Sequence, residues 1–198
     1  YAYFNSLMND LNATGICVGH HRDDSVETVI INLLRGTGIH GLTGIAPKNG
    51  HIIRPLLGVT HNEILAALDA MQQDYVTDSS NLCDDVVRNK IRLHVLPLLQ
   101  TINPSAKACI AKTAERLTEA AKIVDEYMAE TERCATTNIP LPSSSPRQTA
   151  QQMRIDIGAL LNSASPEMVL FHLINRFGFN ADQTEQINHL LVNRSQHP

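Results

Sequence analysis

The sequence predicts an α/β part that extends to about residue 80, followed by an all-helical part. An apolar run, GICVG at 15–19, feeds directly into an amphipathic helical pattern, the order found in strand-to-helix units. After residue 100 the apolar spacing is helical almost throughout. Aromatic residues make up only 4% of the chain and tryptophan is absent, which favours helices or a mixed fold over a β-sandwich.

Specific residues indicate where the helices and strands of the first part begin and end. Pro55 must end the second strand, because proline lacks the N–H that a sheet ladder needs. Thr60, three residues before Glu63, forms a capping box that opens a helix. The glycine-rich segment 36–44 reads as a loop. We therefore expect, in order, a helix at 1–11, a buried strand at 15–19, a helix at 23–35, a strand at 51–57 and a helix from Thr60 to about residue 71.

The second part begins after polar turn residues at 77–85, which lead into a helix carrying VVRNKIRLHVLPLL. Asn103-Pro104-Ser105 starts a long alanine-rich helix to about residue 135. The segment 137–148 is rich in Pro and Ser and reads as a loop or linker. A short extended piece, a helix capped by Asp156, and helices opened at 165–167 and at 180 complete the chain.

Composition limits the class of protein. The net charge of -4 excludes a surface that is basic all over, so any nucleic-acid contact must come from a local patch. The four cysteines form no CxxC pair, and no apolar run reaches the roughly 18 residues of a membrane span. We therefore expect a cytoplasmic protein with no membrane partner. The chain opens within a helical pattern without an initiator Met, so we expect an internal segment of a longer protein.

The stretch GHHRDDSVET at 19–28 concentrates titratable groups behind the predicted strand. Helical spacing puts Asp24, Glu27 and Thr28 on one side of the first turns. The two carboxylates also have a simpler explanation, since acids in a first turn complement the helix dipole. The preceding His20 and His21 suit either Mg²⁺ with phosphates or a transition-metal hydrolase. The later histidines are scattered without ligand spacing, which disfavours the hydrolase.

A basic segment, RNKIRLH, lies in the helix after the turn. Arg88 and Arg92 are four residues apart and share a helix face, so they can grip phosphate through forked donors. Taken alone, this face is more typical of a solvated basic surface. Arg54 in RPLL is equally weak evidence by itself, because a lone arginine often only pairs with a neighbouring carboxylate.

The order and spacing of these motifs together are more specific than any one of them. GHHRDDSVETVIINLLRGTGIHGLTGI, then RPLL, then DSSN with RNKIRLHVLPLL resemble the tRNA(Ile)-lysidine synthetase family of PP-loop ATP pyrophosphatases over nearly all of residues 1–100. The resemblance implies the C-terminal part of a PP-loop, adenine nucleotide alpha hydrolase-like, parallel-sheet domain at 1–98. Residues 99–198 resemble that family's helical middle domain.

The resemblance also implies an activity. In this family ATP adenylates carbon 2 of the wobble cytidine in the isoleucine tRNA with a CAU anticodon, and L-lysine then displaces AMP to give lysidine. The expected class is therefore a ligase forming a carbon–nitrogen bond, with ATP and Mg²⁺ as cofactors. A homodimer is the candidate assembly.

Site residues carry over from the resemblance at matching positions. Asp24 and Glu27 are expected to hold Mg²⁺ and to serve catalysis together with Arg92. The residues expected at ATP are His20, His21, Asp23, Thr28 and Arg35. Those expected at tRNA are Arg54, Arg88 and Lys90.

One family motif does not occur in the sequence, and two other functions stay open. No Ser-Gly-Gly-x-Asp-Ser loop is present among the 198 residues. We therefore expect a fragment that lacks the N-terminal PP-loop motif and is inactive by itself. A PP-loop tRNA cytidine thiolase is one alternative, disfavoured by the isolated cysteines. The other is a non-catalytic tRNA-binding module, in which the carboxylates only cap a helix.

Overall fold

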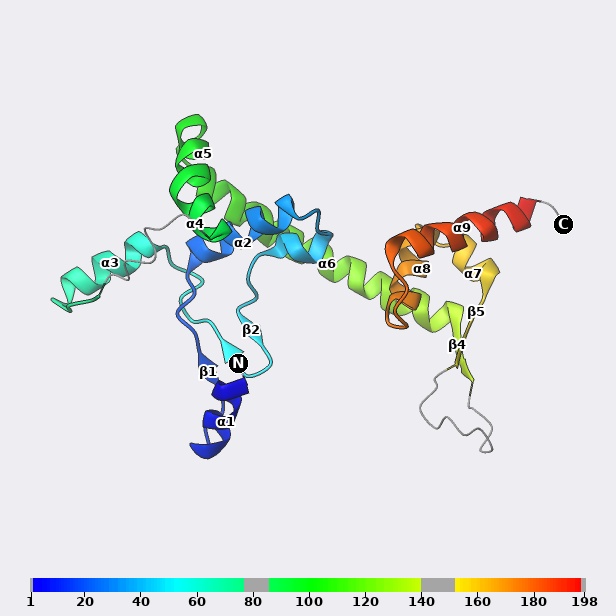
Figure 1. The fold of residues 1–198 in the computed structure, drawn as a ribbon, viewed down its shortest axis with the longest axis horizontal. Helices are drawn as coiled ribbons and strands as arrows, with labels where there is room; N and C mark the ends of the chain where they lie inside the picture. The colour runs from blue at the N-terminus through cyan, green and yellow to red at the C-terminus, as the bar shows by residue number, and fades with distance from the viewer. Residues whose placement is uncertain (1, 77–85, 140–151, 197–198) are drawn as a thin grey trace. The chain divides into compact units, whose positions relative to one another are not determined.

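The computed structural model describes residues 2–76, 86–139 and 152–196, and it divides into two compact units, Tyr1–Ala121 and Lys122–Pro198. Figure 1 shows the elements of each unit along the chain. The turn expected at 77–85 lies outside the described residues, as does most of the linker expected at 137–148.

The first unit contains short strands and several helices. Its strands are β1 (Ile16–Cys17), β2 (Lys48–Asn49) and β3 (Ile52–Ile53). Its helices are α1 (Ala2–Asp10), α2 (Arg22–Leu34), the 3-10 helix η1 (Ile39–Thr43), α3 (His61–Ala70), α4 (Val87–Lys90), the π-helix η3 (Ile91–Val95), α5 (Leu96–Ile102) and the first part of α6 (Ala106–Ala135). The expected order of strands and helices is confirmed, and the antiparallel β2 and the 3-10 helix are additions.

The sheet of the first unit has the strand order β1-β3-β2. β1 runs parallel to β3, with Ile16 opposite Ile52, and β2 runs antiparallel to β3. Successive side chains of a strand point to opposite faces of the sheet. Ile16 is accordingly half-buried while Cys17 is exposed, so the expectation of a buried strand here was wrong.

The core of the first unit is formed between helices. Val26, Ile30 and Ile31 of α2 pack with Ile91 and Leu96. Partly buried residues of the same helices and of α6 complete this cluster: Val95, Leu99, Ile110 and Ala111. The start of α6 therefore belongs to the first compact unit, and the division into compact units falls within α6.

A π-helical turn interrupts the helix that carries the basic segment. It spans Ile91–Val95, between α4 and α5. Pro97 follows at the second position of α5; it has no N–H to donate and its ring collides with the carbonyl four residues earlier. A wider turn avoids this clash, and such turns recur at functional sites.

The second unit is mainly helical but also contains a β-hairpin. Its helices besides α6 are α7 (Ile157–Leu161), α8 (Pro166–Asn175) and α9 (Ala181–Gln196). The strands β4 (Thr136–Ile139) and β5 (Gln152–Ile155) pair antiparallel, with Thr136 opposite Ile155. The expectation of an all-helical second part was therefore wrong. The β-branched residues that follow α6 favour an extended strand, and residues 152–155 supply the strand that pairs with it.

The predicted helix caps of both units are present. Thr60 accepts a hydrogen bond from the Glu63 N–H at 3.2 Å, and the Glu63 carboxylate accepts one from the Thr60 N–H at 2.6 Å. Asp156 accepts from the Ala159 N–H at 2.9 Å. Within the described segments, no helix combines the length and the apolar character that crossing a membrane requires.

The second unit has a separate apolar core. Leu160 and Leu173 are fully buried, and they pack with Met128, Val169, Leu170 and Ile174. We expect Leu173→Ala to lower the free energy of unfolding by about 2–5 kcal/mol, since the change removes buried apolar surface and leaves a cavity. Urea denaturation followed by circular dichroism measures this. Leu190→Ala, at a side chain that is 66% exposed, is the control and should change the value by less than about 0.5 kcal/mol.

Candidate active site

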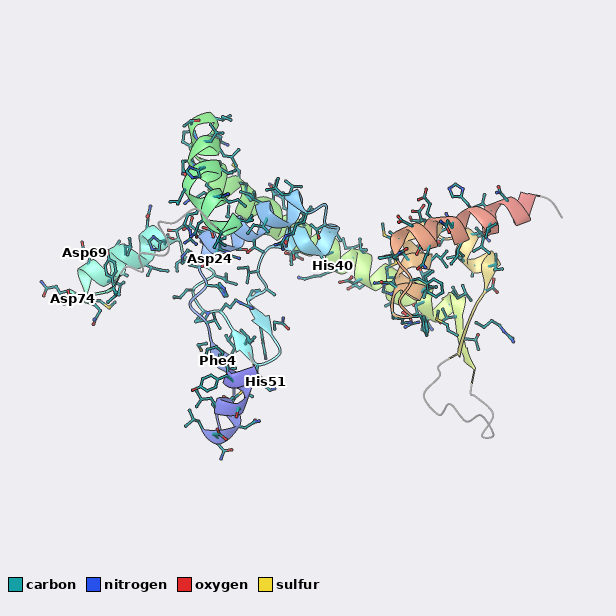
Figure 2. All side chains as sticks on the ribbon, viewed as in Figure 1. Phe4, Asp24, His40, His51, Asp69 and Asp74 are labelled. Carbon is teal, nitrogen blue, oxygen red and sulfur yellow. The ribbon has the colours of Figure 1, made fainter. Side chains whose placement is uncertain are left out.

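The candidate site lies at the start of α2, directly after the strand β1. In open α/β folds this strand-to-helix edge is where ligands bind. Figure 2 shows the Asp24 side chain here, in the first turn of α2. Asp23, Asp24 and Glu27 are all buried, although they are carboxylates. Buried charges require partners, and the structure supplies them from elements distant in sequence.

Arg92 is the partner of Glu27. Its Nε donates to Glu27 Oε1 at 2.6 Å, and its Nη2 donates to Oε2 at 2.9 Å. Such a two-pronged contact is among the strongest charge-assisted hydrogen bonds in proteins. The hydrogen bond to Glu27 raises the pKa of Arg92 above its usual value, despite partial burial. The Glu27 residue is only 1% exposed, so this ion pair fastens η3 to α2.

Asp24 of α2 faces the arginines of both α4 and η3. Its Oδ1 is 3.3 Å from Nη2 of Arg92 and 3.7 Å from Nη1 of Arg88. Arg88 also donates from Nη2 to Thr28 Oγ1 at 3.2 Å. The expected common face of the two arginines is confirmed, but it is not a solvated face, because both guanidinium groups lie against the carboxylates of α2.

Asp23 faces away from the arginines and binds other partners. Its Oδ2 accepts the backbone N–H of His61 at 2.8 Å, and its Oδ1 is 3.0 Å from Nζ of Lys107. Burial alone would raise the pKa of Asp23, but the His61 hydrogen bond and the Lys107 ammonium outweigh it and lower the pKa. Asp23 is therefore held ionised at neutral pH.

The histidines and Arg54 extend the site toward the sheet. The His21 backbone N–H donates to Asp24 Oδ2 at 3.0 Å, and the His21 ring lies 5.3 Å from that of His61. Arg54 donates from Nε to His20 Nδ1 at 3.3 Å and from Nη1 to the Ala46 carbonyl at 2.7 Å. His20 and Arg54 thus stand together, as a link between the strand-to-helix turn and the segment after β3.

Two of the predicted residues are not brought to this cluster. Arg35 is exposed and caps the C-terminal end of α2, about 16 Å along the helix axis from Asp24 at 1.5 Å per residue. Lys90 is exposed on α4. Their assignments to ATP and tRNA remain predictions.

The donor set does not fit the Mg²⁺ role expected for Asp24 and Glu27. Both Glu27 oxygens accept hydrogen bonds from Arg92, and Asp24 Oδ1 faces two guanidinium groups. Across the part of the chain that the structure describes, no group of three His, Cys, Asp or Glu side chains is arranged to hold a metal. The carboxylates act here as partners of arginine.

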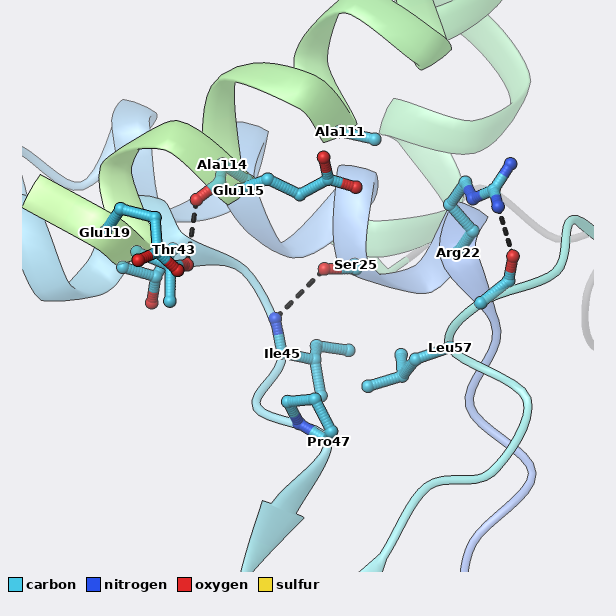
Figure 3. Close-up of a pocket in the computed structure, with 12 residues that line it drawn as sticks. Arg22, Ser25, Thr43, Ile45, Pro47, Leu57, Ala111, Ala114, Glu115 and Glu119 are labelled. Atoms are coloured by element: carbon cyan, nitrogen blue, oxygen red, sulfur yellow. Dashed lines mark hydrogen bonds between the residues drawn. The ribbon is translucent and has the colours of Figure 1, made fainter.

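A pocket of about 370 Å³ occupies another face of α2, between that helix, the segments around 43–47 and 57–58, and α6 (Figure 3). Arg22 reaches it and donates to the Gly58 carbonyl. Ser25 accepts from the Ile45 N–H at 3.0 Å. None of the residues predicted for the site lines this pocket, so α2 separates it from the charged cluster.

Two contributors to the cluster were not predicted from the sequence. Lys107 belongs to no motif and lies far along the chain from Asp23, so only the folded structure reveals the contact. The second is the backbone N–H of His61, which carries no sequence signal except that it starts the helix capped by Thr60.

A parallel strand–helix unit with ionisable side chains at the carboxyl end of its first strand defines an α/β ligand-binding domain. Comparison with known families specifies it further, since the PP-loop domain model matches residues 1–99, half of the chain. The chain belongs to the PP-loop family. A second model, described as the TilS substrate binding domain, matches residues 148–196.

Curated relatives extend this result over nearly the whole chain. The tRNA(Ile)-lysidine synthase of Bacteroides thetaiotaomicron is 44% identical over 187 residues, which is 94% of this chain and 41% of the relative. That of Parabacteroides distasonis is 44% identical over 179 residues, or 90% of this chain and 38% of the relative. The tRNA(Ile)-lysidine synthase of Porphyromonas gingivalis W83 is 36% identical over 188 residues, which is 94% of this chain and 38% of the relative. The chain thus spans about two fifths of the length of these relatives.

The family match corrects one expectation. We expected a fragment that lacks the N-terminal PP-loop motif and contains the C-terminal part of the PP-loop domain at 1–98, yet the PP-loop domain is found at residues 1–99. The expectation relied on the Ser-Gly-Gly-x-Asp-Ser loop alone, and the rest of the domain pattern is sufficient for the match.

The Glu27–Arg92 pair predicts a stability effect. Glu27→Gln keeps the size of the side chain but removes the charge that Arg92 binds, so we expect the free energy of unfolding to fall by about 1–3 kcal/mol. Urea denaturation at neutral pH measures this change. Glu130→Gln is the matched control, because Glu130 also pairs with an arginine but is exposed, and we expect a clearly smaller loss of stability, since water screens an exposed pair. Equal losses in the two variants would contradict the structural role of Glu27.

Proposed function

We propose that the protein carrying this chain is a tRNA(Ile)-lysidine synthase. The observation that carries the proposal is the 44% identity with two enzymes of that name along at least 90% of this chain. The charged cluster at the start of α2 supports it, because a reaction on phosphates needs fixed cationic donors at such an edge.

The chemistry has two steps. The O2 atom of the wobble cytidine attacks the α-phosphorus of ATP, a P–O bond forms, and pyrophosphate leaves. An amine of L-lysine then attacks carbon 2, a C–N bond forms, and the C–O bond breaks as AMP leaves. The amine loses a proton, so the sum of the steps is ligation driven by ATP cleavage to AMP and pyrophosphate.

Arg88 and Arg92 are proposed to meet phosphate groups in this reaction, of ATP or of the tRNA backbone. About a third of each side chain is exposed, at 35% and 31%, although both are anchored by buried carboxylates. Anchored guanidinium groups are already oriented when charge develops in a transition state. Asp24 and Glu27 then contribute by holding these cations in place.

The remaining assignments rest on the resemblance. They are ATP with Mg²⁺ as cofactors, isoleucine tRNA with a CAU anticodon and L-lysine as substrates, a homodimer, and a cytoplasmic location. His20, His21 and Thr28 are proposed near ATP, and Arg54 near tRNA. We also keep the proposed domain division at residues 98 and 99, with the substrate binding match at 148–196 in the second domain.

The direct test is AMP release in the presence of tRNA, lysine, ATP and Mg²⁺, measured on the full-length protein. Asp24→Asn should lower the rate by on the order of a hundredfold, because it removes a charge that orients both arginines. Asp69→Asn, at an exposed position of α3, is the control and should keep the wild-type rate. No release by the wild type would favour a non-catalytic module, and release that requires an added sulfur donor in place of lysine would favour a thiolase.

The arginines are tested by the salt dependence of tRNA binding. Arg88→Ala should reduce the slope of log K against log salt by about one, if Arg88 meets a tRNA phosphate. Arg133→Ala, an exposed arginine paired with Glu130, should leave the slope unchanged. For Arg92 the useful variant is Arg92→Lys, because alanine would remove both hydrogen bonds to the buried Glu27 and leave it the longer contact with Arg88 at 3.7 Å. Arg92→Lys keeps the charge, so its readout is the affinity for ATP and not the salt slope. An unchanged slope in Arg88→Ala together with normal ATP affinity in Arg92→Lys would contradict the phosphate role.

A further inference from the structure

We propose that Lys107 is a positioning residue which, through Asp23, fixes the first turn of α2 and therefore the orientation of Asp24. Its effect on stability follows from the geometry alone. Its effect on catalysis rests on the proposed function.

Both carboxylate oxygens of Asp23 contact other groups of the protein. One oxygen is 3.0 Å from Lys107 Nζ, and the other accepts the His61 N–H at 2.8 Å. The Asp23 side chain is only 10% exposed. A carboxylate so occupied is poorly placed to contact a nucleotide, so Asp23 serves the site by holding its neighbours.

The position of Lys107 within α6 points to a tertiary role. It is the second residue of that helix, where the positive end of the helix dipole disfavours a cation. The turn before α6 is already satisfied locally, since the Ser105 N–H donates to Asn103 Oδ1 at 3.0 Å. The contact with Asp23 supplies the compensating interaction, because it pairs the ammonium with a buried carboxylate.

Asp23 thereby joins the starts of three helices, α2, α3 and α6. The Arg22 N–H donates to the Val59 carbonyl at 2.8 Å, which holds the same turn of α2 to the segment before α3. Asp24 follows Asp23 directly, so any rotation of this turn moves the carboxylate that faces Arg88 and Arg92. The apolar packing of Ile110 and Ala111 on the core keeps α6 docked without Lys107, so its replacement is expected to loosen the turn and not to unfold the unit.

The first experiment is a double-mutant cycle in the full-length protein, with Asp23→Asn and Lys107→Met, followed by urea unfolding. We expect each single change to lower the folding equilibrium constant about tenfold, and the double variant to match the singles within a factor of three. Lys112→Met is the control, because Lys112 is exposed and pairs with the exposed Glu115 on the same helix, and it should change the constant less than threefold. Fully additive losses in the cycle would overturn the proposal.

The second experiment separates positioning from ligand binding. At a temperature where all variants are folded, Lys107→Met should lower kcat for AMP release about tenfold, with KM for ATP changed less than twofold. Lys107→Arg, which keeps the charge, should restore at least half of kcat. A raised KM with unchanged kcat would overturn the proposal, as would an arginine variant no better than methionine. If the wild-type protein releases no AMP, the proposed function fails, and the cycle still decides whether Lys107 and Asp23 are coupled.

Discussion

The buried ion pair between Glu27 and Arg92 is the interaction on which the candidate site depends. A carboxylate almost fully removed from water is stable only with a cation in close contact, and the guanidinium of Arg92 meets both of its oxygens. This requirement brings η3 against the first turns of α2. Asp24, Thr28 and Arg88 then fall within reach of one another. One charged contact therefore organises side chains from two segments distant in sequence.

Apolar packing holds together the helices that carry this ion pair. α2 carries two different faces, with carboxylates at its start toward the arginines and Val26 and Ile30 in the core beside Ile91 and Leu96. Ile91 and Arg92 are adjacent in the π-helical turn, so one turn supplies both a core side chain and the ion-pair partner. Pro97 accounts for the wider helical turn, since a regular α-helix would place its ring against a carbonyl. Core and site are thus parts of the same helix contact.

Much of the fold was predictable because its signals are local. The capping box at Thr60, the cap at Asp156 and the proline and glycine boundaries act within a few residues, and the structure has them where they were expected. The hairpin of β4 and β5 was not predicted, because most of its first strand overlaps the segment 137–148, whose Pro and Ser content indicates a loop, and because pairing needs a partner strand at 152–155. The contact of Ile110 and Ala111 with the core of the first unit has no local signal for the same reason, since it joins α6 to residues far away in the sequence.

The sequence by itself determined the family resemblance, the position of the carboxylates at a helix start and the common face of Arg88 and Arg92, because motif order and helical spacing are properties of the chain. Only the tertiary structure decided what those groups bind. Spacing placed Asp24 and Glu27 together and left a cation, a phosphate-bound metal or the helix dipole as possible partners. Folding supplied Arg92 to Glu27 and Lys107 to Asp23. The reason is that the partner of a buried charge depends on how far the charge is removed from water and on which groups lie near it in three dimensions. The spacing of residues along one segment determines neither of these.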